Sequence, residues 1–150
     1  MGNLDQLRAA VTRRLESLPA LAGVPVVPED RQNLKSEIDR ALGQAGGLVL
    51  TVSMANARGA APNDPLPQAD VEVVVECAEI PAVNRSAAGR QIPAVTASVL
   101  AVCALHHWPW EPGKVLTYSE TLYDRDDNKA LVAYTCIFTT RVAFAAALGV

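Results

Sequence analysis

The stretch from residue 115 to residue 142 constrains the fold more than any other part of the sequence. Two runs rich in β-forming residues, 115–123 and 130–142, flank the polar segment 124–129. This pattern is typical of a β-hairpin with a solvated turn. The second run is far longer than a typical strand of about five or six residues. We therefore expect the domain to end in a long hairpin whose second strand extends beyond its own sheet.

Further elements are expected before this hairpin. Apolar residues at helical spacing predict helices at 4–18, after residues 29–30, and at 91–106. Alternating apolar residues predict strands at 48–55 and 71–77. Pro25 and Pro28 restrict residues 24–28 to an extended segment at a sheet edge. We expect one domain over residues 1–150 with an α+β fold: a mixed, mostly antiparallel sheet of four to five strands with helices on one face.

The helix expected at 91–106 has two apolar sides. One is bulky and the other is small, so we expect both sides to be buried and the helix to lie centrally on the sheet. Trp108 and Trp110, beside a break rich in Pro and Gly, are expected to clamp that loop to the core. The bulky side comprises Ile92, Val95, Val99, Val102 and His106, and the small side comprises Ala94, Ala97, Ala101 and Ala104.

Two segments are in excess of what a compact core needs. Residues 56–70 are rich in Ala, Pro, Gly and Asp, which predicts a flexible loop; it is either a contact arm that orders on binding or a plain surface loop. The apolar tail 143–150 either packs on its own domain or is donated to a neighbour.

Charge and composition exclude several classes of partner. The formal net charge is −3 and basic residues are scattered among acidic ones, so we expect no sequence-specific nucleic-acid ligand. The charged N-terminus does not resemble a secretory signal, and no apolar run reaches the roughly 20 residues of a membrane span. Cys77, Cys103 and Cys136 lie in apolar runs, which favours reduced thiols and the cytoplasm.

The residues that could carry chemistry form no complete site. Cys103, His106 and His107 could share a helix end, yet a zinc site needs about three or four protein ligands and the chain has no other histidine. A role for the two histidines in capping the helix end is the alternative. A small metal-dependent enzyme or sensor built on these three residues stays open as a second hypothesis.

Acidic residues and serines give no stronger signal. Asp124, Asp126 and Asn128 resemble the start of a calcium loop, but Lys129 and Thr135 stand where glycine and glutamate are needed, so a solvated turn is expected. Three glutamates on the strand 71–77 and just after it are expected to lie on the solvent-exposed face of that strand. No serine lies in a nucleophile elbow. We expect no catalytic, cofactor-binding or metal-binding residues, and therefore no enzyme. Those glutamates are Glu72, Glu76 and Glu79.

The order of these elements, over Leu4 to Val142, resembles the tail terminator and tail-completion (minor tail protein) family of long-tailed bacteriophages and prophages. The Glu-bearing strand that runs into residues 81–85, followed by a helix and paired strands, carries the resemblance. It implies a ring, commonly hexameric, that caps the tail tube and joins it to the head. The implied partners are further copies of the chain, the tail tube protein and a head-completion or neck protein. The implied location is the bacterial host cytoplasm and then the virion tail.

The expected contact residues follow from the resemblance and from the surplus segments. Asn84 and Arg85 match the family's loop before the helix, although Asn84 could equally cap a local turn. A head–tail connector or neck protein of the same particle is one alternative function. A binding adaptor whose arm 56–70 folds on a partner is another. The remaining expected contact residues are Arg58 and Asp64 in the arm, Arg141 in the long strand and Phe144 in the tail.

Overall fold

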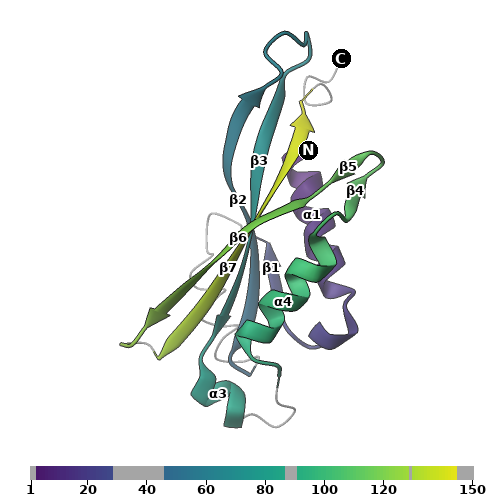
Figure 1. The fold of residues 1–150 in the computed structure, drawn as a ribbon. Helices are drawn as coiled ribbons and strands as arrows, with labels where there is room; N and C mark the ends of the chain where they lie inside the picture. Colours follow the sequence, from purple (N-terminus) through teal and green to yellow (C-terminus); the bar gives the residue numbers. More distant parts are fainter. Residues whose placement is uncertain (1–2, 29–45, 87–90, 129, 145–150) are drawn as a thin grey trace.

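A computed structural model of the chain describes residues 3–28, 46–86, 91–128 and 130–144 (Figure 1). The helix expected after residues 29–30 and most of the expected tail, 145–150, lie outside the described residues. The expected helices and strands of the described part occur in the expected order, but the segment 56–70 differs. The short helix Pro81–Ser86, the 3₁₀ turn Pro19–Leu21 and the strand pair Pro109–Glu111 and Lys114–Val115 were not predicted.

The described strands form one large sheet and one small one. The large sheet has five strands in the order β1-β2-β3-β7-β6, in which β1 is parallel to β2 and the other pairs are antiparallel. Its strands are β1 (Val26–Pro28), β2 (Leu48–Ala60), β3 (Gln68–Glu79), β6 (Thr117–Asp126) and β7 (Leu131–Ala143). The small sheet pairs β4 (Pro109–Glu111) with β5 (Lys114–Val115). The predicted α+β class and the C-terminal hairpin are confirmed, and the proline-bearing segment lies at the sheet edge as expected.

Two helices cover one face of the large sheet. These are α1 (Asn3–Glu16) and α4 (Ala94–Leu105), while the short α3 (Pro81–Ser86) lies at one end of the molecule (Figure 1). A short 3₁₀ turn, Pro19–Leu21, follows α1. Leu7, Val11 and Leu15 of α1 are fully buried in the same cluster as the sheet residues. The core therefore lies between this helical layer and the sheet.

The centre of the core is built from alternate residues of β3 and β7. Val71, Val73 and Val75 of β3 pair with Thr140, Phe138 and Cys136 of β7, and the two strands are paired from end to end. On its other side β7 pairs with β6. The expectation that the last strand outruns its sheet is therefore wrong, because β7 lies inside the sheet with a partner on each side. The edge strands of the described sheet are β1 and β6.

The segment 56–70 is the largest difference from the sequence prediction. β2 continues to Ala60 and β3 begins at Gln68, so only residues 61–67 form the turn. The predicted long loop is wrong because backbone pairing does not require β-forming side chains: Gly59 and Ala60 still pair with Ala69 and Gln68. A register shift between Met54 and Ala57 marks where the extended part begins.

The helix α4 buries one side and exposes the other. Ala94, Ala97 and Ala101 are fully buried against the sheet, since alanine lets a helix approach closely. Val95 and Val99, by contrast, are 47% and 56% exposed. The prediction that both sides are buried is wrong for Val95, Val99 and His106, whereas Ile92 and Val102 of the bulky side pack partly buried against the core. The helix is the outer layer at this point, so nothing within the described residues covers the valines.

The tryptophan clamp is confirmed, with Trp110 buried in the core and Trp108 packed partly buried against it. Trp110 is buried, and its indole nitrogen donates a hydrogen bond of 2.9 Å to the Thr140 hydroxyl on β7. That hydroxyl in turn donates to the carbonyl of Val115 at 2.9 Å. These bonds fasten the small β4–β5 sheet to the end of β7.

Candidate assembly surfaces

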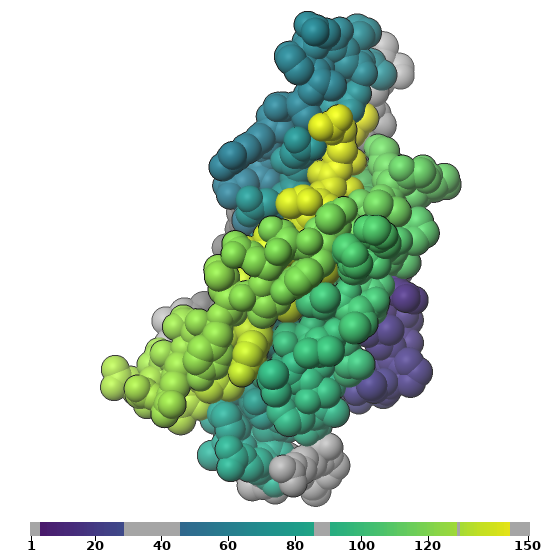
Figure 2. Space-filling model, viewed as in Figure 1, coloured from purple at the N-terminus to yellow at the C-terminus, as the bar shows by residue number. Residues whose placement is uncertain are grey.

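Two hairpins project from the domain in different directions. The β2–β3 hairpin extends beyond the helices at one end, and the β6–β7 hairpin extends beyond them at the other (Figure 1). Figure 2 shows both as separate projections from the body of the molecule. We call residues 60–67 the β2–β3 tip and residues 124–128 the β6–β7 tip.

The β2–β3 tip is apolar, although turns on protein surfaces are usually polar. Leu66 is 49% exposed and stands between two prolines. The Asp64 carboxylate shapes the turn by accepting hydrogen bonds from the Leu66 backbone at 2.9 Å and the Gln68 side chain at 2.6 Å. Asp64, an expected contact residue, thus has an internal role at this tip. The apolar members of the tip are Ala60, Ala61, Pro62, Pro65, Leu66 and Pro67.

Two more of the expected charged contact residues lie near the base of the same hairpin. Arg58 is exposed on β2, in register with Asp70 of β3. Arg141 of β7 forms a 3.0 Å ion pair with that Asp70. Both arginines therefore lie on one sheet face, beside one shared acidic residue.

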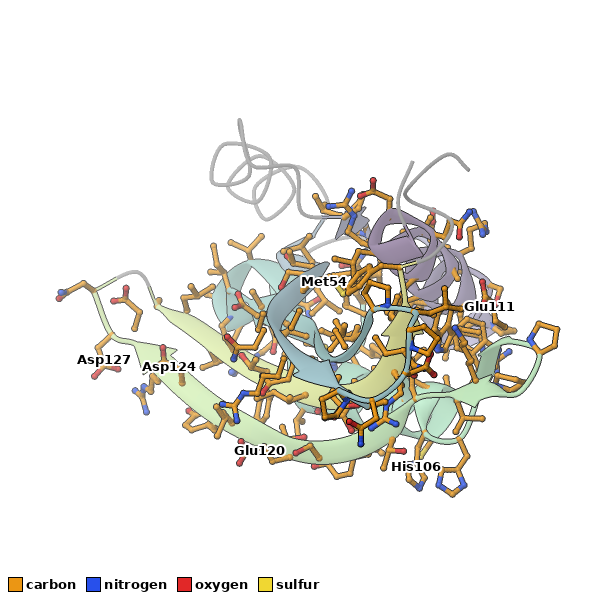
Figure 3. All side chains as sticks on the ribbon, turned by 90° about the horizontal axis from the view of Figure 1, so that it is seen from above. Met54, His106, Glu111, Glu120, Asp124 and Asp127 are labelled. Atoms are coloured by element: carbon orange, nitrogen blue, oxygen red, sulfur yellow. The ribbon has the colours of Figure 1, made fainter. Side chains whose placement is uncertain are left out.

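The β6–β7 tip is built from charged residues. Arg125 forms an ion pair with Asp127, and the backbone of Asn128 donates to the Asp126 carboxylate at 3.1 Å. Figure 3 shows Asp124 and Asp127 at the far end of the hairpin, pointing away from the body of the protein. The expectation of a solvated turn at this point is confirmed.

A third surface is the uncovered side of α4. Val95, Val99 and Cys103 follow one another at intervals of one helical turn, and all three are exposed. We call these three residues the α4 ridge. The other cysteines, Cys77 and Cys136, are buried, and burial raises the pKa of both thiols. Cys103 is thus the accessible thiol among the three.

The histidines at the end of α4 do not complete a metal site with other described residues. His106 ends the helix, and its Nδ1 accepts a 3.0 Å hydrogen bond from the Tyr118 backbone of β6. Its ring lies 4.1 Å from that of His107. Within the described ranges, no three residues of the metal-binding types are grouped together. Figure 3 places His106 far from Asp124 and Asp127. His106 is the C-cap residue of α4, which is the position that the capping alternative expected, and its imidazole also links α4 to β6.

A buried polar cluster below α4 was missed in the sequence. Glu79 is 6% exposed, and its carboxylate accepts hydrogen bonds from the Asn84 side chain at 2.6 Å and from the Ala94 backbone at 3.0 Å. The Asn84 amide also donates to the Ile92 carbonyl at 3.1 Å. The expectation that Glu79 marks a wet face is wrong. Glu72 and Glu76 share one side of β3, whereas residue 79 shares the other side with Cys77, so the odd spacing was a usable signal.

The remaining expected contact residues fall into different environments. Asn84 is only 2% exposed, so it holds the α3–α4 connection together and offers no surface to a partner. Arg85 is exposed and lines a cavity of about 470 Å³ between α3 and the β6–β7 hairpin. Phe144 packs against the core, and its backbone donates to the Pro67 carbonyl at 2.9 Å, beside the β2–β3 tip.

The sheet face opposite the helices is rich in carboxylates. Burial, and secondly the charge of Asp124, raise the pKa of Glu76. Glu76 belongs to the β2–β3 hairpin and Asp124 to the β6–β7 hairpin, so the two hairpins are coupled electrostatically at this face. Glu120 of β6 also lies on this face.

The described residues thus define a small α+β domain with helices on one face of a mixed sheet and two projecting hairpins. No helix among them is both long and apolar enough to cross a bilayer. No family model and no curated protein matches the chain. Among solved structures, the fold is similar to a chain from the virion of a native gene transfer agent particle, with a TM-score of 0.61 and 18% identity. The match covers 91% of this chain and 94% of that one, and at this identity it concerns the fold.

Proposed function

We propose that this chain is a structural protein of a phage-like particle, and that it acts as a tail terminator. The observation that carries the proposal is the similarity of fold to a virion chain, which covers 91% of this chain and 94% of that one. Because nearly all of both chains match, the similarity concerns a whole domain. The order of elements in the sequence supports the same assignment independently.

The surfaces fit a protein that acts by assembly. A closed ring of identical copies needs two different surfaces on each copy, one for each neighbour. The apolar β2–β3 tip and the exposed α4 ridge are two such surfaces, and both expose apolar area that a monomer gains nothing by exposing.

In the proposed ring, further copies of the chain are the first partners, and a hexamer is the expected stoichiometry. One side of the ring binds the end of the tail tube, and the other side meets a head-completion or neck protein. The chain assembles in the host cytoplasm and remains in the virion tail. Its role requires binding and no chemical step, so neither a cofactor nor a metal enters the mechanism.

The proposal is tested by the mass of the full chain in solution. Light scattering is measured over rising concentration, alone and with isolated tail tubes, and the products are viewed by electron microscopy. A closed ring of fixed stoichiometry at tube ends is expected. A monomer under both conditions would contradict the proposal. Gold labelling of an added peptide tag in whole particles separates a terminator at the tube end from a connector at the head.

A further inference from the structure

We propose that the cavity between α3 and the β6–β7 hairpin binds an acidic segment of another protein, by holding one of its carboxylates between Arg85 and Arg125. The place of this contact in a particle rests on the proposed function, in which a protein that meets the ring supplies the segment. The site itself lies within one copy of the chain and does not require the ring.

The cavity lies between two parts of the molecule that are distant in the sequence. Its volume is about 470 Å³, and Figure 1 shows α3 and the β6–β7 tip at the same end of the molecule. Ala82 and Arg85 of α3 line one side, and Arg125, Asp127 and residues 131–132 line the other. Sites that bind ligands have volumes of roughly 300–1,000 Å³, so this one has room for a few side chains of a partner.

The side that carries Arg85 is held in place by buried contacts. The side chain of the preceding residue, Asn84, is buried and donates hydrogen bonds to the Glu79 carboxylate and the Ile92 carbonyl. Gly47 packs so closely here that a Cβ atom on it would lie 2.9 Å from the Asn84 nitrogen. These bonds occupy the buried Glu79 carboxylate, which does not line the cavity. Asn84 thus anchors α3, and the exposed Arg85 extends from a fixed base.

On the other side, a neighbouring carboxylate orients Arg125. Its Nε donates to Asp127, which leaves the two terminal guanidinium nitrogens without a partner among the residues that the structure describes. The guanidinium of Arg85 likewise makes no hydrogen bond or ion pair with any described residue. One carboxylate can accept hydrogen bonds from both groups, and bonds between two charged partners are the stronger kind.

The charge of the lining favours a single carboxylate. Arg85 and Arg125 contribute +2 and Asp127 contributes −1, which gives a net formal charge of +1. Asp124 and Asp126 alternate with Arg125 along β6 and therefore lie on its other face. One carboxylate balances the lining, whereas the second negative charge of a phosphate group would stay unbalanced beside Asp127.

Apolar and aromatic side chains extend the site beyond the two arginines. Leu131 and Val132 line the cavity itself. Tyr123 pairs with Tyr134 just as Arg125 pairs with Val132, so the tyrosines continue the same face of the hairpin. Their rings lie 5.1 Å apart, and Tyr123 is exposed. Tyrosine and arginine dominate many protein–protein contacts. The occupant is therefore a polypeptide segment in which aliphatic residues flank the acidic one.

The first test measures binding of a peptide to the full chain. The probe is acetyl-Ala-Leu-Glu-Leu-Ala-amide with a fluorescent label, followed by fluorescence anisotropy. The same peptide with glutamine in place of glutamate should bind about tenfold more weakly, because it lacks the charge. Inorganic phosphate at the concentration of the peptide should not displace it. Equal affinity for the two peptides, or displacement by phosphate, would overturn the inference.

The second test compares two arginines. Arg85→Gln should raise the dissociation constant of the glutamate peptide by about tenfold. Arg13→Gln is the matched control, because Arg13 is an exposed arginine of α1 and the change removes the same charge. The control should change the dissociation constant by less than about twofold. Melting temperatures establish that both variants fold, and equal losses of affinity would overturn the site.

A third test looks for a gain of binding, which misfolding cannot produce. Arg85→Glu reverses the charge on one side of the cavity and leaves Asp127 on the other. This variant should bind the peptide with lysine at its centre about threefold more tightly than the wild-type chain does, or better. A folded variant with no preference for the lysine peptide would overturn the inference.

The outcomes separate this inference from the proposed function. Rings that form normally but bind the two peptides equally would overturn the site and leave the ring intact. A chain that stays monomeric, alone and on tubes, but prefers the glutamate peptide and loses this preference with Arg85→Gln, would overturn the ring and support the site.

Discussion

The two hairpins of this domain share one construction and differ in surface chemistry. Each joins two long antiparallel strands and extends past the helical layer, and each is rooted in the same β3–β7 core. The β2–β3 tip exposes alanine, proline and leucine, whereas the β6–β7 tip exposes arginine and aspartate. The two hairpins therefore have similar backbones, and the side chains at each tip determine whether its surface is apolar or charged.

The difference is explained by the need to prevent an exposed edge strand from pairing with other chains. β6 is an edge strand of ten residues, and an edge of that length invites pairing with other chains. Its charged residues, among them Glu120, Asp124 and Arg125, oppose such pairing. The β2–β3 tip has one charged residue, Asp64, and exposes Leu66, which is why we propose that this tip takes part in assembly.

The largest expected effect concerns the core that both hairpins share. Phe138 of β7 is fully buried opposite Val73 of β3. Phe138→Ala should lower the free energy of unfolding by about 3–5 kcal/mol, because it removes buried area and leaves a cavity. Thr139→Ala, at the exposed neighbouring position, should change it by less than about 0.5 kcal/mol. Urea denaturation measures both, and similar values would mean that the hairpins do not share this core.

The next effect concerns the buried end of the first hairpin. Glu79→Ala removes the acceptor of the Asn84 amide and the Ala94 backbone, which then stay buried without this partner. The expected loss is about 2–3 kcal/mol. Glu72→Ala, on the opposite side of β3, should cost less than about 0.5 kcal/mol. Equal costs for the two glutamates would contradict the buried cluster.

A smaller effect should distinguish the two tips directly. Asp64→Ala removes two hydrogen bonds that shape the β2–β3 tip and should cost about 1 kcal/mol. Asp127→Ala removes an ion pair with Arg125 in which both side chains are more than half exposed, at 76% and 65%. Such surface pairs contribute about 0–0.5 kcal/mol. Thermal denaturation compares the two variants, and a larger cost at Asp127 would reverse the assigned roles.

The smallest effect lies where the hairpins meet. The pKa of Glu76 is raised, chiefly by burial, so the folded chain binds this proton more tightly than the unfolded chain does. Stability therefore falls as the pH rises from the ordinary glutamate pKa through the raised one, and the loss persists above it. Glu76→Gln should increase stability at neutral pH and flatten this part of the pH profile. Asp124→Asn should act in the same direction but less, and an unchanged profile for both would count against the coupling.

Local patterns predicted most of the described elements. Helical spacing from Leu4 to Leu18 and the polar turn after residue 123 are short-range signals. The turn matched the structure, and the helix was found over Asn3–Glu16, two residues shorter at its end than predicted. The extension of β2 and β3 to Ala60 and Gln68 depends on pairing between distant residues, which composition does not report. The exposure of Val99 was missed for a related reason, since a helix with two apolar sides is also what a chain needs when one side binds another copy.

The candidate site was predicted less well than the fold. Asn84 was predicted as a contact residue but is buried, and its amide donates a hydrogen bond to Glu79 at the end of β3. Leu66 was not singled out at all, since one leucine in a proline-rich segment has no periodicity. Its significance depends on the structure, where it stands exposed at the end of a rigid hairpin.

The central claim is that assembly buries the β2–β3 tip and leaves the other hairpin exposed. The most direct measurement is the rate of thiol labelling of Leu66→Cys and Leu122→Cys, each in a Cys103→Ser background, before and after ring formation. Labelling at position 66 should slow by about tenfold or more on assembly, as expected for a group that reacts only when the contact opens, while labelling at position 122 should keep its rate. Equal rates at position 66 in the free and assembled chain would contradict the account.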